Sequence, residues 1–293
     1  MTDLAANAPD VPARQEMNLT WSNLMAHPTF LVGMSALTVV FLLTLGALAL
    51  SPWDPYDIAF RSRLSPPSTQ HWLGTDNLGR DLFTRLAHGA SVSFQVGVAV
   101  ALFNGIVGTA CGALAGYYRM LDGPIMRLMD ALMAFPAILL ALGIAAALGP
   151  SLTNVILALS VTYTPQTARI VRSRVLVLRG LDYIDASRLF GSRDGWILLR
   201  HVVPNTLSPL VVQLTSVFAY AVLAETTLSF LGVGLPPPMP SWGSIIADGR
   251  DYVVDAWWIC LSPGVAITIV VLALNLVGDS LRDVLDPHLK ERT

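Results

Sequence analysis

Charged residues are scarce in this chain of 293 residues. They make up 13% of the sequence, whereas soluble domains carry about 25%. Hydrophobic residues reach 54%, and the mean hydropathy is +0.59. A chain loses charge in this way when much of its length faces lipid or other apolar helices, because a charged side chain inside the bilayer is costly. The composition therefore argues against a soluble protein and excludes a disordered chain, and it indicates a membrane protein.

Features that several common functions require are also absent. The net charge is −2, so there is no basic field to attract nucleic acid. Cys111 and Cys260 both lie in apolar stretches, which excludes a disulfide scaffold. No G-x-x-x-x-G-K-[ST] sequence occurs, and the five histidines lack the close spacing of metal ligands. We expect no catalytic residue, no metal site, no cofactor bound by this chain and no nucleic-acid partner.

Long hydrophobic stretches are abundant instead. A membrane-spanning helix needs about 20 mostly apolar residues, because a rise of ~1.5 Å per residue must cross ~30 Å of hydrocarbon. Five stretches meet this requirement: Phe30–Leu50, Val92–Tyr117, Ile125–Leu148, Leu207–Leu231 and Ala256–Gly278. A sixth, Ser151–Ala168, is more polar and contains Pro165, but turn signals bound it. The sequence thus predicts an all-α, polytopic membrane protein with six transmembrane helices.

The basic residues predict the orientation, because cytoplasmic loops of membrane proteins carry an excess of them. With the N-terminus inside, thirteen of the eighteen basic residues fall in cytoplasmic segments and five in external ones. Both termini are therefore expected in the cytoplasm, and lipid is expected around the helices. The predicted order begins with a cytoplasmic tail (1–29), a first transmembrane helix (30–50) and an external segment (51–89). A five-helix core (90–278) with one cytoplasmic loop (169–205) and a second cytoplasmic tail (279–293) follow.

One predicted span carries a packing signature. Gly108, Gly112 and Gly116 recur every four residues, so they line one helix face and let a neighbouring helix approach closely. We expect this contact inside one bundle, and a dimer interface is the alternative.

The cytoplasmic loop contains a short amphipathic helix, followed by a second helical stretch, Trp196–Val203. Asp182 is the candidate N-cap, and Gly191 lies where a helix C-terminus often needs a left-handed residue. Between them lies an apolar stripe of four side chains, Tyr183, Ile184, Leu189 and Phe190. Exposed apolar side chains on this face must be covered. The cover is either a soluble partner or the lipid interface.

The same loop resembles the EAA loop of ABC-importer permeases. That loop has the form E-A-A, three residues, G, nine residues and I-x-L-P. This chain has Asp185-Ala186-Ser187, Gly191 and His201-Val202-Val203-Pro204 at the same spacing. It departs from the pattern at positions 185, 187, 201 and 203. The carboxylate is kept at 185, whereas the hydrophobic pair is replaced by His201 and Val203.

Three further segments resemble the dipeptide, oligopeptide and nickel permease family of ABC importers. Two of them are HWLGTDNLGRDLFTRLAHGASVSFQVG (His71–Gly97) and MRLMDALMAFPAILLAL (Met126–Leu142). The third begins at Ala224 and contains AETTLSFLGVG, WGSIIADGRDY, AWW and LNLVGDSLRDVLDP in that order. The resemblance covers about Leu31 to Leu289, and it is greatest to the C-type of the two paralogous permease subunits in such systems.

This resemblance implies the type I ABC-importer permease architecture in a bacterial inner membrane. The implied partners are a paralogous permease, two cytoplasmic ATPase subunits or domains that bind ATP with magnesium, and an extracytoplasmic substrate-binding protein. The loop would dock into an ATPase as a coupling helix and drive alternating access. Its coupling residues are then Tyr183, Asp185, Ala186, Ser187, Leu189, Phe190, Gly191, His201 and Pro204. The implied substrate is a di- or oligopeptide, with nickel or another small solute as alternatives.

Residues 71–89 of the external segment have helical spacing. Asp76 with Arg80, and Asp81 with Arg85, are acid-before-base pairs four residues apart. Three leucines repeat at the same interval: Leu78, Leu82 and Leu86. We expect a helix that lies along the outer membrane face or caps the bundle. The functional alternative is that the four charged residues form an external gate or contact the binding protein.

Polar side chains inside the predicted spans are candidates for a translocation pathway. They are Glu225, which we expect beside Gln213, together with Asn154 and Asn275. Hydrogen bonds between helices are the structural alternative for all four. The competing functional class is an ion-coupled secondary transporter that uses Glu225 and Asp130, but such a protein would not need the amphipathic loop.

Overall fold

The computed structural model describes residues 24–285, and within this range the chain is helical without a strand. The predicted all-α class is confirmed. Short helices α8 (Asp182–Leu189), α9 (Asp194–Ile197) and α11 (Trp242–Gly249) lie between longer ones. The long helices are α2 (Pro28–Leu50), α3 (Leu82–Phe103), α4 (Thr109–Tyr117), α5 (Arg119–Met133), α6 (Ala137–Leu148), α7 (Leu152–Leu178), α10 (Leu207–Phe230) and α12 (Trp258–Leu285).

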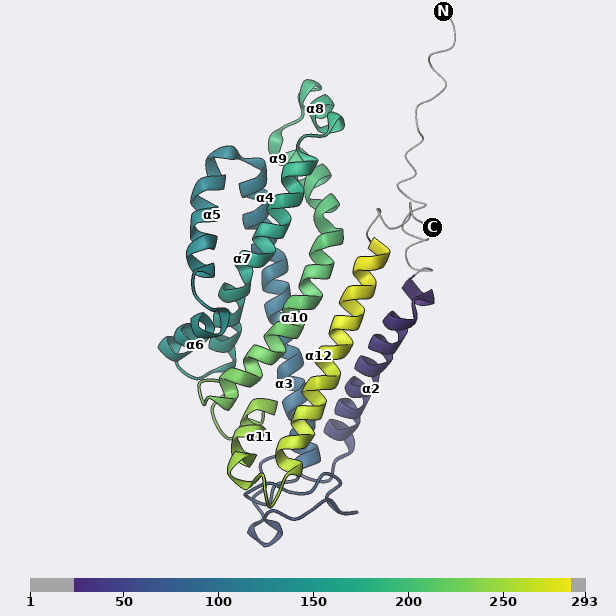
Figure 1. Ribbon diagram of the computed structural model, residues 1–293, viewed down its shortest axis with the longest axis vertical. Coiled ribbons are helices and arrows are strands. Elements are labelled where there is room, and N and C mark those ends of the chain that lie inside the picture. Colours follow the sequence, from purple (N-terminus) through teal and green to yellow (C-terminus); the bar gives the residue numbers. More distant parts are fainter. Residues whose placement is uncertain (1–23, 286–293) are drawn as a thin grey trace, which may run out of the picture.

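These helices form an elongated bundle (Figure 1). α7, α10, α12 and α2 follow one another across the view, and α3 passes behind α10. The loop with α8 lies at one end of the bundle, and α11 lies with residues 51–81 at the other end. Predictions for the tails outside residues 24–285 fall outside the described residues.

The number of apolar spans differs from the predicted six. Within residues 24–285, four helical stretches are long and apolar enough to cross a membrane, and α5 with α6 makes a fifth if the two count as one broken span. The four stretches are Pro28–Leu50, Leu82–Tyr117, Asp194–Phe230 and Trp258–Leu285. α7 is long enough but not apolar enough. Its position explains the difference, because about half of its side chains are buried against other helices rather than facing lipid.

The predicted third span is not one continuous helix. α5 ends at Met133, Pro136 is extended with φ −55° and ψ 129°, and α6 then leaves at 91° to α5. Proline has no N–H to donate, so the break at this position has a direct chemical cause. α5 is fastened to α7 instead, by Arg172 with Asp122 at 2.5 Å and Arg169 with Asp130 at 2.7 Å.

α7 also extends further than predicted. It continues ten residues beyond Ala168 to Leu178, so the first part of the predicted loop 169–205 is helix. Val171, Val175 and Leu178 are buried at successive turns, and this packing extends the helix.

The glycine signature is confirmed as a contact within the bundle. A Cβ atom on Gly108 would lie 2.8 Å from the Thr167 side chain, and one on Gly116 would lie 2.8 Å from Val175. A Cβ on Gly112 would collide with the carbonyl oxygen of Ala168. The three glycines therefore let α4 lie directly against α7, the helix pair with the most extensive contact in the fold.

Candidate functional site

The helix α8 ends as its sequence predicts, but its N-cap lies one residue before the predicted one. Its N-cap is Leu181 and not Asp182, which instead lies in the first turn, where a carboxylate favours the positive end of the helix dipole. At the other end, Gly191 has φ +82°. The Gly191 N–H donates to the Arg188 carbonyl at 2.9 Å, and the Ser192 N–H donates to the Ser187 carbonyl at 3.1 Å. These two bonds form a Schellman cap, which requires a left-handed residue.

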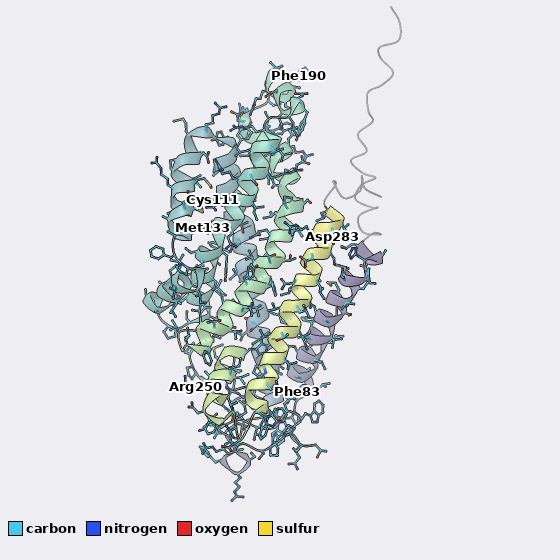
Figure 2. All side chains as sticks on the ribbon, in the orientation of Figure 1. Phe83, Cys111, Met133, Phe190, Arg250 and Asp283 are labelled. Atoms are coloured by element: carbon cyan, nitrogen blue, oxygen red, sulfur yellow. The ribbon has the colours of Figure 1, made fainter. Side chains whose placement is uncertain are left out.

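The apolar side chains of α8 face in two directions rather than one. Ile184 is completely buried against the bundle, whereas Leu189 and Phe190 are 89% and 90% exposed. Figure 2 shows Phe190 at the tip of the loop, at the opposite end of the molecule from Arg250. The predicted four-residue stripe is therefore wrong in detail. Ile184 anchors the helix, and the pair Leu189 and Phe190 forms a projecting apolar tip beside the exposed Tyr183, Asp185 and Ala186 and the half-buried Ser187.

The second half of the loop packs its aromatic side chains against α8. His201 lies with its ring 4.8 Å from Trp196 and 6.3 Å from Tyr183, measured between ring centroids. The predicted second helical stretch is present, as α9 followed by irregular helical turns up to Thr206. Pro204 is exposed in the last of these turns, directly before α10. Tyr183 and His201 thus meet across the loop although eighteen positions separate them.

A charged network that the sequence did not reveal ties this loop to the bundle. Arg188 lies 2.9 Å from Asp185 and 3.9 Å from Asp194, and its guanidinium lies over the Tyr117 ring at 5.5 Å. The Tyr117 hydroxyl donates to Asp194 at 2.7 Å. The pKa of Arg188 is raised above its ordinary value, mainly by the interaction of its guanidinium with Tyr117 and to a smaller extent by its hydrogen bond to Asp185. No sequence pattern signals this network, because Tyr117 comes from α4.

At the other end, the external segment is not the predicted helix. Helix α3 begins only at Leu82, and Leu78 lies in the preceding turn. Asp81 is the N-cap: it accepts from the Thr84 N–H at 2.9 Å and lies 2.9 Å from His71. Asp81 is therefore not paired with Arg85 as predicted.

The two arginines share two carboxylates instead. Arg80 lies 2.6 Å from Asp76 and 3.1 Å from Asp248 of α11, and Arg85 lies 3.3 Å and 3.4 Å from the same two residues. The predicted charged residues Asp76, Arg80, Asp81 and Arg85 are all at most 7% exposed. They are too buried to touch a binding protein, so that part of the prediction is wrong in this conformation. The outer cluster, defined as these four residues with His71 and Asp248, joins residues 51–81, α3 and α11.

The four candidate pathway residues are not brought together. Glu225 is completely buried and accepts hydrogen bonds from Ser229 at 2.7 Å and Ser93 at 3.2 Å. Gln213 is twelve residues away on the same helix, about 18 Å along its axis, so the predicted pairing with Glu225 is wrong. Asn154 donates to the carbonyl groups of Leu148 and Gly149, both at 2.9 Å, and it orders the turn between α6 and α7.

Gln213 belongs instead to a stripe on the open side of α10 that is polar except for the exposed Leu223. Gln213, Ser216, Tyr220 and Thr227 recur at steps of three, four and seven residues, so they share one helix face. The other sides of α10 pack against α3 through Phe218, against α12 through Thr215, and against α7. Tyr220 is 48% exposed near the middle of the helix and stacks on Tyr163 of α7 at 6.3 Å. Asn275 is exposed on the neighbouring α12.

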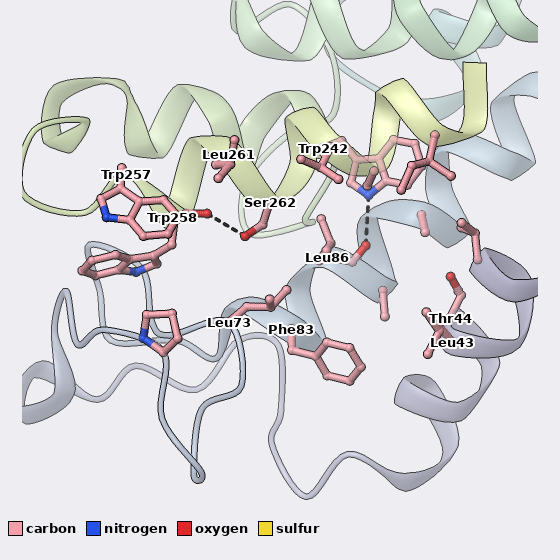
Figure 3. A pocket seen from close by; sticks show the side chains of 17 residues that line it. Leu43, Thr44, Leu73, Phe83, Leu86, Trp242, Trp257, Trp258, Leu261 and Ser262 are labelled. Atoms are coloured by element: carbon pink, nitrogen blue, oxygen red, sulfur yellow. Dashed lines mark hydrogen bonds between the residues drawn. The ribbon is translucent and has the colours of Figure 1, made fainter. Parts of the chain in front are cut away.

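An apolar cavity of about 400 Å³ lies near the outer cluster (Figure 3). It is lined by α2, α3, α11 and α12, together with Pro67 and Leu73 of the external segment and Trp257 before α12. Trp242, one of its lining residues, donates its indole N–H to the Leu86 carbonyl at 3.1 Å. None of its lining residues belongs to the α10 stripe. Among the described residues, no group of three or more His, Cys, Asp or Glu side chains could hold a metal ion.

Comparisons with known proteins agree with this architecture. Residues 108–291 match a family described as the inner membrane component of binding-protein-dependent transport systems. A Brucella abortus protein, named for a peptide transport system permease, is 55% identical over 99% of both chains. The dipeptide transport system permease protein DppC of Alkalihalophilus pseudofirmus is 42% identical over 89% of this chain and 86% of its own. The di/tripeptide transport system permease protein DppC of Pseudomonas aeruginosa is 39% identical over 99% and 98%.

Proposed function

Because the chain belongs to the family of inner membrane components of binding-protein-dependent transport systems, we propose that it is the permease subunit of an ATP-driven importer of di- and oligopeptides. The names of its relatives refer to peptide, dipeptide and di/tripeptide transport, and this shared reference supports the substrate class. The subunit itself performs no covalent chemistry. ATP with magnesium is bound and hydrolysed by two cytoplasmic ATPase subunits or domains.

The projecting tip of α8 is the observation that carries this function. Leu189 and Phe190 are the two most exposed apolar side chains of the loop, yet the helix beneath them is anchored by Ile184 and closed by Gly191. A rigid helix with an apolar tip suits insertion into a groove of a soluble partner. A lipid-bound helix would instead lay its apolar side along the membrane surface. The tip therefore docks into the ATPase, with Asp185, Ala186 and Ser187 on the same helix and His201 and Pro204 behind it.

The opposite end faces the substrate-binding protein. The outer cluster holds residues 51–81, α3 and α11 together there, and a paralogous permease completes the pathway. In this arrangement the N- and C-termini lie in the cytoplasm, in a bacterial inner membrane. The positive-inside rule supports that orientation, since the loop end carries the larger share of arginine.

The polar stripe of α10 lines the pathway in this proposal. A hydroxyl or amide near the centre of the bilayer is costly when it faces lipid, so a face with the half-buried Gln213 and Ser216 and the exposed Tyr220 suits a polar conduit. Hydroxyl and amide groups exchange hydrogen bonds with the peptide groups of a substrate. The exposed Asn275 of the neighbouring α12 is assigned to the pathway as a separate polar position. Glu225 and Asn154 have structural roles instead, because Glu225 accepts hydrogen bonds inside the bundle and Asn154 donates to the turn between α6 and α7.

Uptake by the purified complex tests the proposal. Proteoliposomes that contain the complex and its binding protein should accumulate a radiolabelled dipeptide with ATP, and should not do so with a non-hydrolysable analogue. A double variant, Leu189→Asp with Phe190→Asp, should lose uptake because it places charges in the docking groove. A second double variant, Leu189→Met with Phe190→Leu, is the matched control, since it keeps both exposed side chains of the tip apolar and should keep uptake. Uptake driven by an ion gradient without ATP would instead establish a secondary transporter.

A further inference from the structure

Tyr117 occupies an unusual junction between the bundle and the loop. It is the last residue of α4 and is only 5% exposed, yet its hydroxyl reaches Asp194 at the start of α9, at 2.7 Å. Its ring lies under the guanidinium of Arg188, with 5.5 Å from the ring centroid to the guanidinium carbon. One side chain of the bundle thus contacts both helices of the loop.

Two arginines close this junction from either side. Arg188 of α8 joins Asp185, at 2.9 Å, to Asp194, at 3.9 Å. Arg179 donates to the carbonyl groups of Gly116 and Tyr117 at 3.0 and 3.1 Å. Those carbonyls end α4 and have no partner within the helix, so a cation there satisfies them and favours the negative end of the helix dipole. The C-terminus of α4 is therefore bound to the loop by hydrogen bonds and charged contacts.

The long helical stretch that ends at Tyr117 is also held by side-chain contacts at its N-terminal end. α3, the π-helical turn η2 (Asn104–Gly108) and α4 form a single helical stretch, Leu82–Tyr117, of 36 residues. At ~1.5 Å per residue this rod is about 54 Å long. Its first turn is held by Asp81 as N-cap and by Arg85, which reaches Asp76, Asp248 and the Pro55 carbonyl.

We propose that Tyr117 is a positioning residue that passes movement of the coupling helix to this rod, and through the rod to the outer cluster. The inference rests on the proposed importer function, and it adds the route by which the ATPase end reaches the opposite end. A displacement of α8 and α9 pulls on Tyr117 through Asp194 and Arg188. The rod then carries Arg85 and Asp81 with it, because both belong to its first turn or cap.

The decisive variant removes only the hydroxyl. Tyr117→Phe loses the bond to Asp194 while keeping the ring under Arg188, and Tyr118→Phe is the matched control on the adjacent residue. Asp194→Asn keeps an acceptor for the Tyr117 hydroxyl, whereas Asp194→Ala removes it. Two quantities are measured on the complete complex: dipeptide taken up per ATP hydrolysed, and the ATP-dependent signal of a fluorophore on Trp72→Cys near the outer cluster. Cys111 and Cys260 are replaced by alanine in all samples.

We expect Tyr117→Phe and Asp194→Ala to lower uptake per ATP about ten-fold and to abolish the fluorescence change. Tyr118→Phe and Asp194→Asn should keep both. Tyr117→Phe, Tyr118→Phe and Asp194→Asn should retain the thermal unfolding temperature, and all four variants should retain the bound ATPase subunits. The proposal is overturned if Tyr117→Phe behaves like Tyr118→Phe. It is also overturned if Tyr117→Phe unfolds earlier or sheds the ATPase, since the residue would then serve folding or docking alone. If the wild type takes up no dipeptide, the proposed substrate fails, and the fluorescence comparison still tests Tyr117.

Discussion

Gly191 sets the end of α8, the proposed coupling helix, through its backbone conformation. Its φ of +82° lies in the left-handed region, which costs a residue with a Cβ about 1–2 kcal/mol. Gly191→Ala should therefore loosen the Schellman cap and lower uptake per ATP several-fold. Gly195→Ala is the control, since Gly195 lies in the same loop without a positive φ and with open space around its Cβ position. If both variants take up the same amount of dipeptide per ATP hydrolysed in proteoliposomes, the Schellman cap has no role in coupling.

The hydrogen bonds of Glu225 lead to a second prediction, which concerns the thermal stability of its variants. Its buried carboxyl group accepts from Ser93 of α3 and Ser229 of α10. Glu225→Gln keeps a polar group of the same shape, so it should unfold close to the wild-type temperature. Glu225→Leu leaves both hydroxyls unpaired, at about 1–3 kcal/mol for each buried group, and should unfold at a clearly lower temperature.

Thermal unfolding of the detergent-solubilised complex measures this difference. Ser93→Ala, which removes one donor, should fall between the two variants. If Glu225→Gln were as unstable as Glu225→Leu while the leucine variant still transported peptide, the hydrogen-bonding role would be wrong.

Single residues differ in how far their contacts could be predicted from the sequence. Gly191 was predictable, because the residues that need it are its immediate neighbours. Arg85 was not, because its partner Asp248 lies 163 positions away, and helical spacing suggested Asp81 instead. Tyr117 was missed for the same reason: Asp194 is 77 positions from it. The local pattern predicted the C-terminal cap of α8 but placed its N-cap at Asp182 instead of Leu181. The partner of a buried charge depends on how distant helices pack.

At the scale of whole helices, the contact between α4 and α7 depends on the absence of a side chain at Gly112. A methyl group there would collide with the Ala168 backbone, which cannot move aside as a flexible side chain could. Gly112→Ala should therefore separate the helices, lower the unfolding temperature and reduce the yield of assembled complex. Gly46→Ala in α2 is the matched control, because nothing lies within 4 Å of its Cβ position. Comparable stability of the two variants would contradict the close packing.

Helix boundaries were less predictable than helix contacts. The four-residue glycine repeat correctly predicted a close contact, because it depends only on which residues share a face. The third span was predicted as one helix, since α5 and α6 together have the required length and apolarity, but Pro136 divides it. α7 was placed by the turn signals that bound Ser151–Ala168, because its hydropathy is lower than that of the other spans. Its extension to Leu178 follows from contacts with α4 that hydropathy does not measure.

For the whole molecule, the sequence established the class and the family resemblance, and the structure adds the division into two ends. One end presents the apolar tip of α8, and the other encloses the outer cluster. The rod Leu82–Tyr117 connects them. A permease that couples ATP hydrolysis to substrate movement needs such a connection, because the motor and the substrate-binding protein act on opposite sides of the membrane.

The orientation of this rod in the membrane can be tested directly. The excess of arginine at the loop end predicts that this end is cytoplasmic. In a background with Cys111 and Cys260 replaced by alanine, an impermeant maleimide should label Arg61→Cys in intact spheroplasts. It should label Arg193→Cys only after the membrane is permeabilised. Both arginines are exposed, one at each end, so they form a matched pair. The reverse labelling pattern would place the coupling helix outside, where no ATPase could reach it, and would remove the basis of the proposed mechanism.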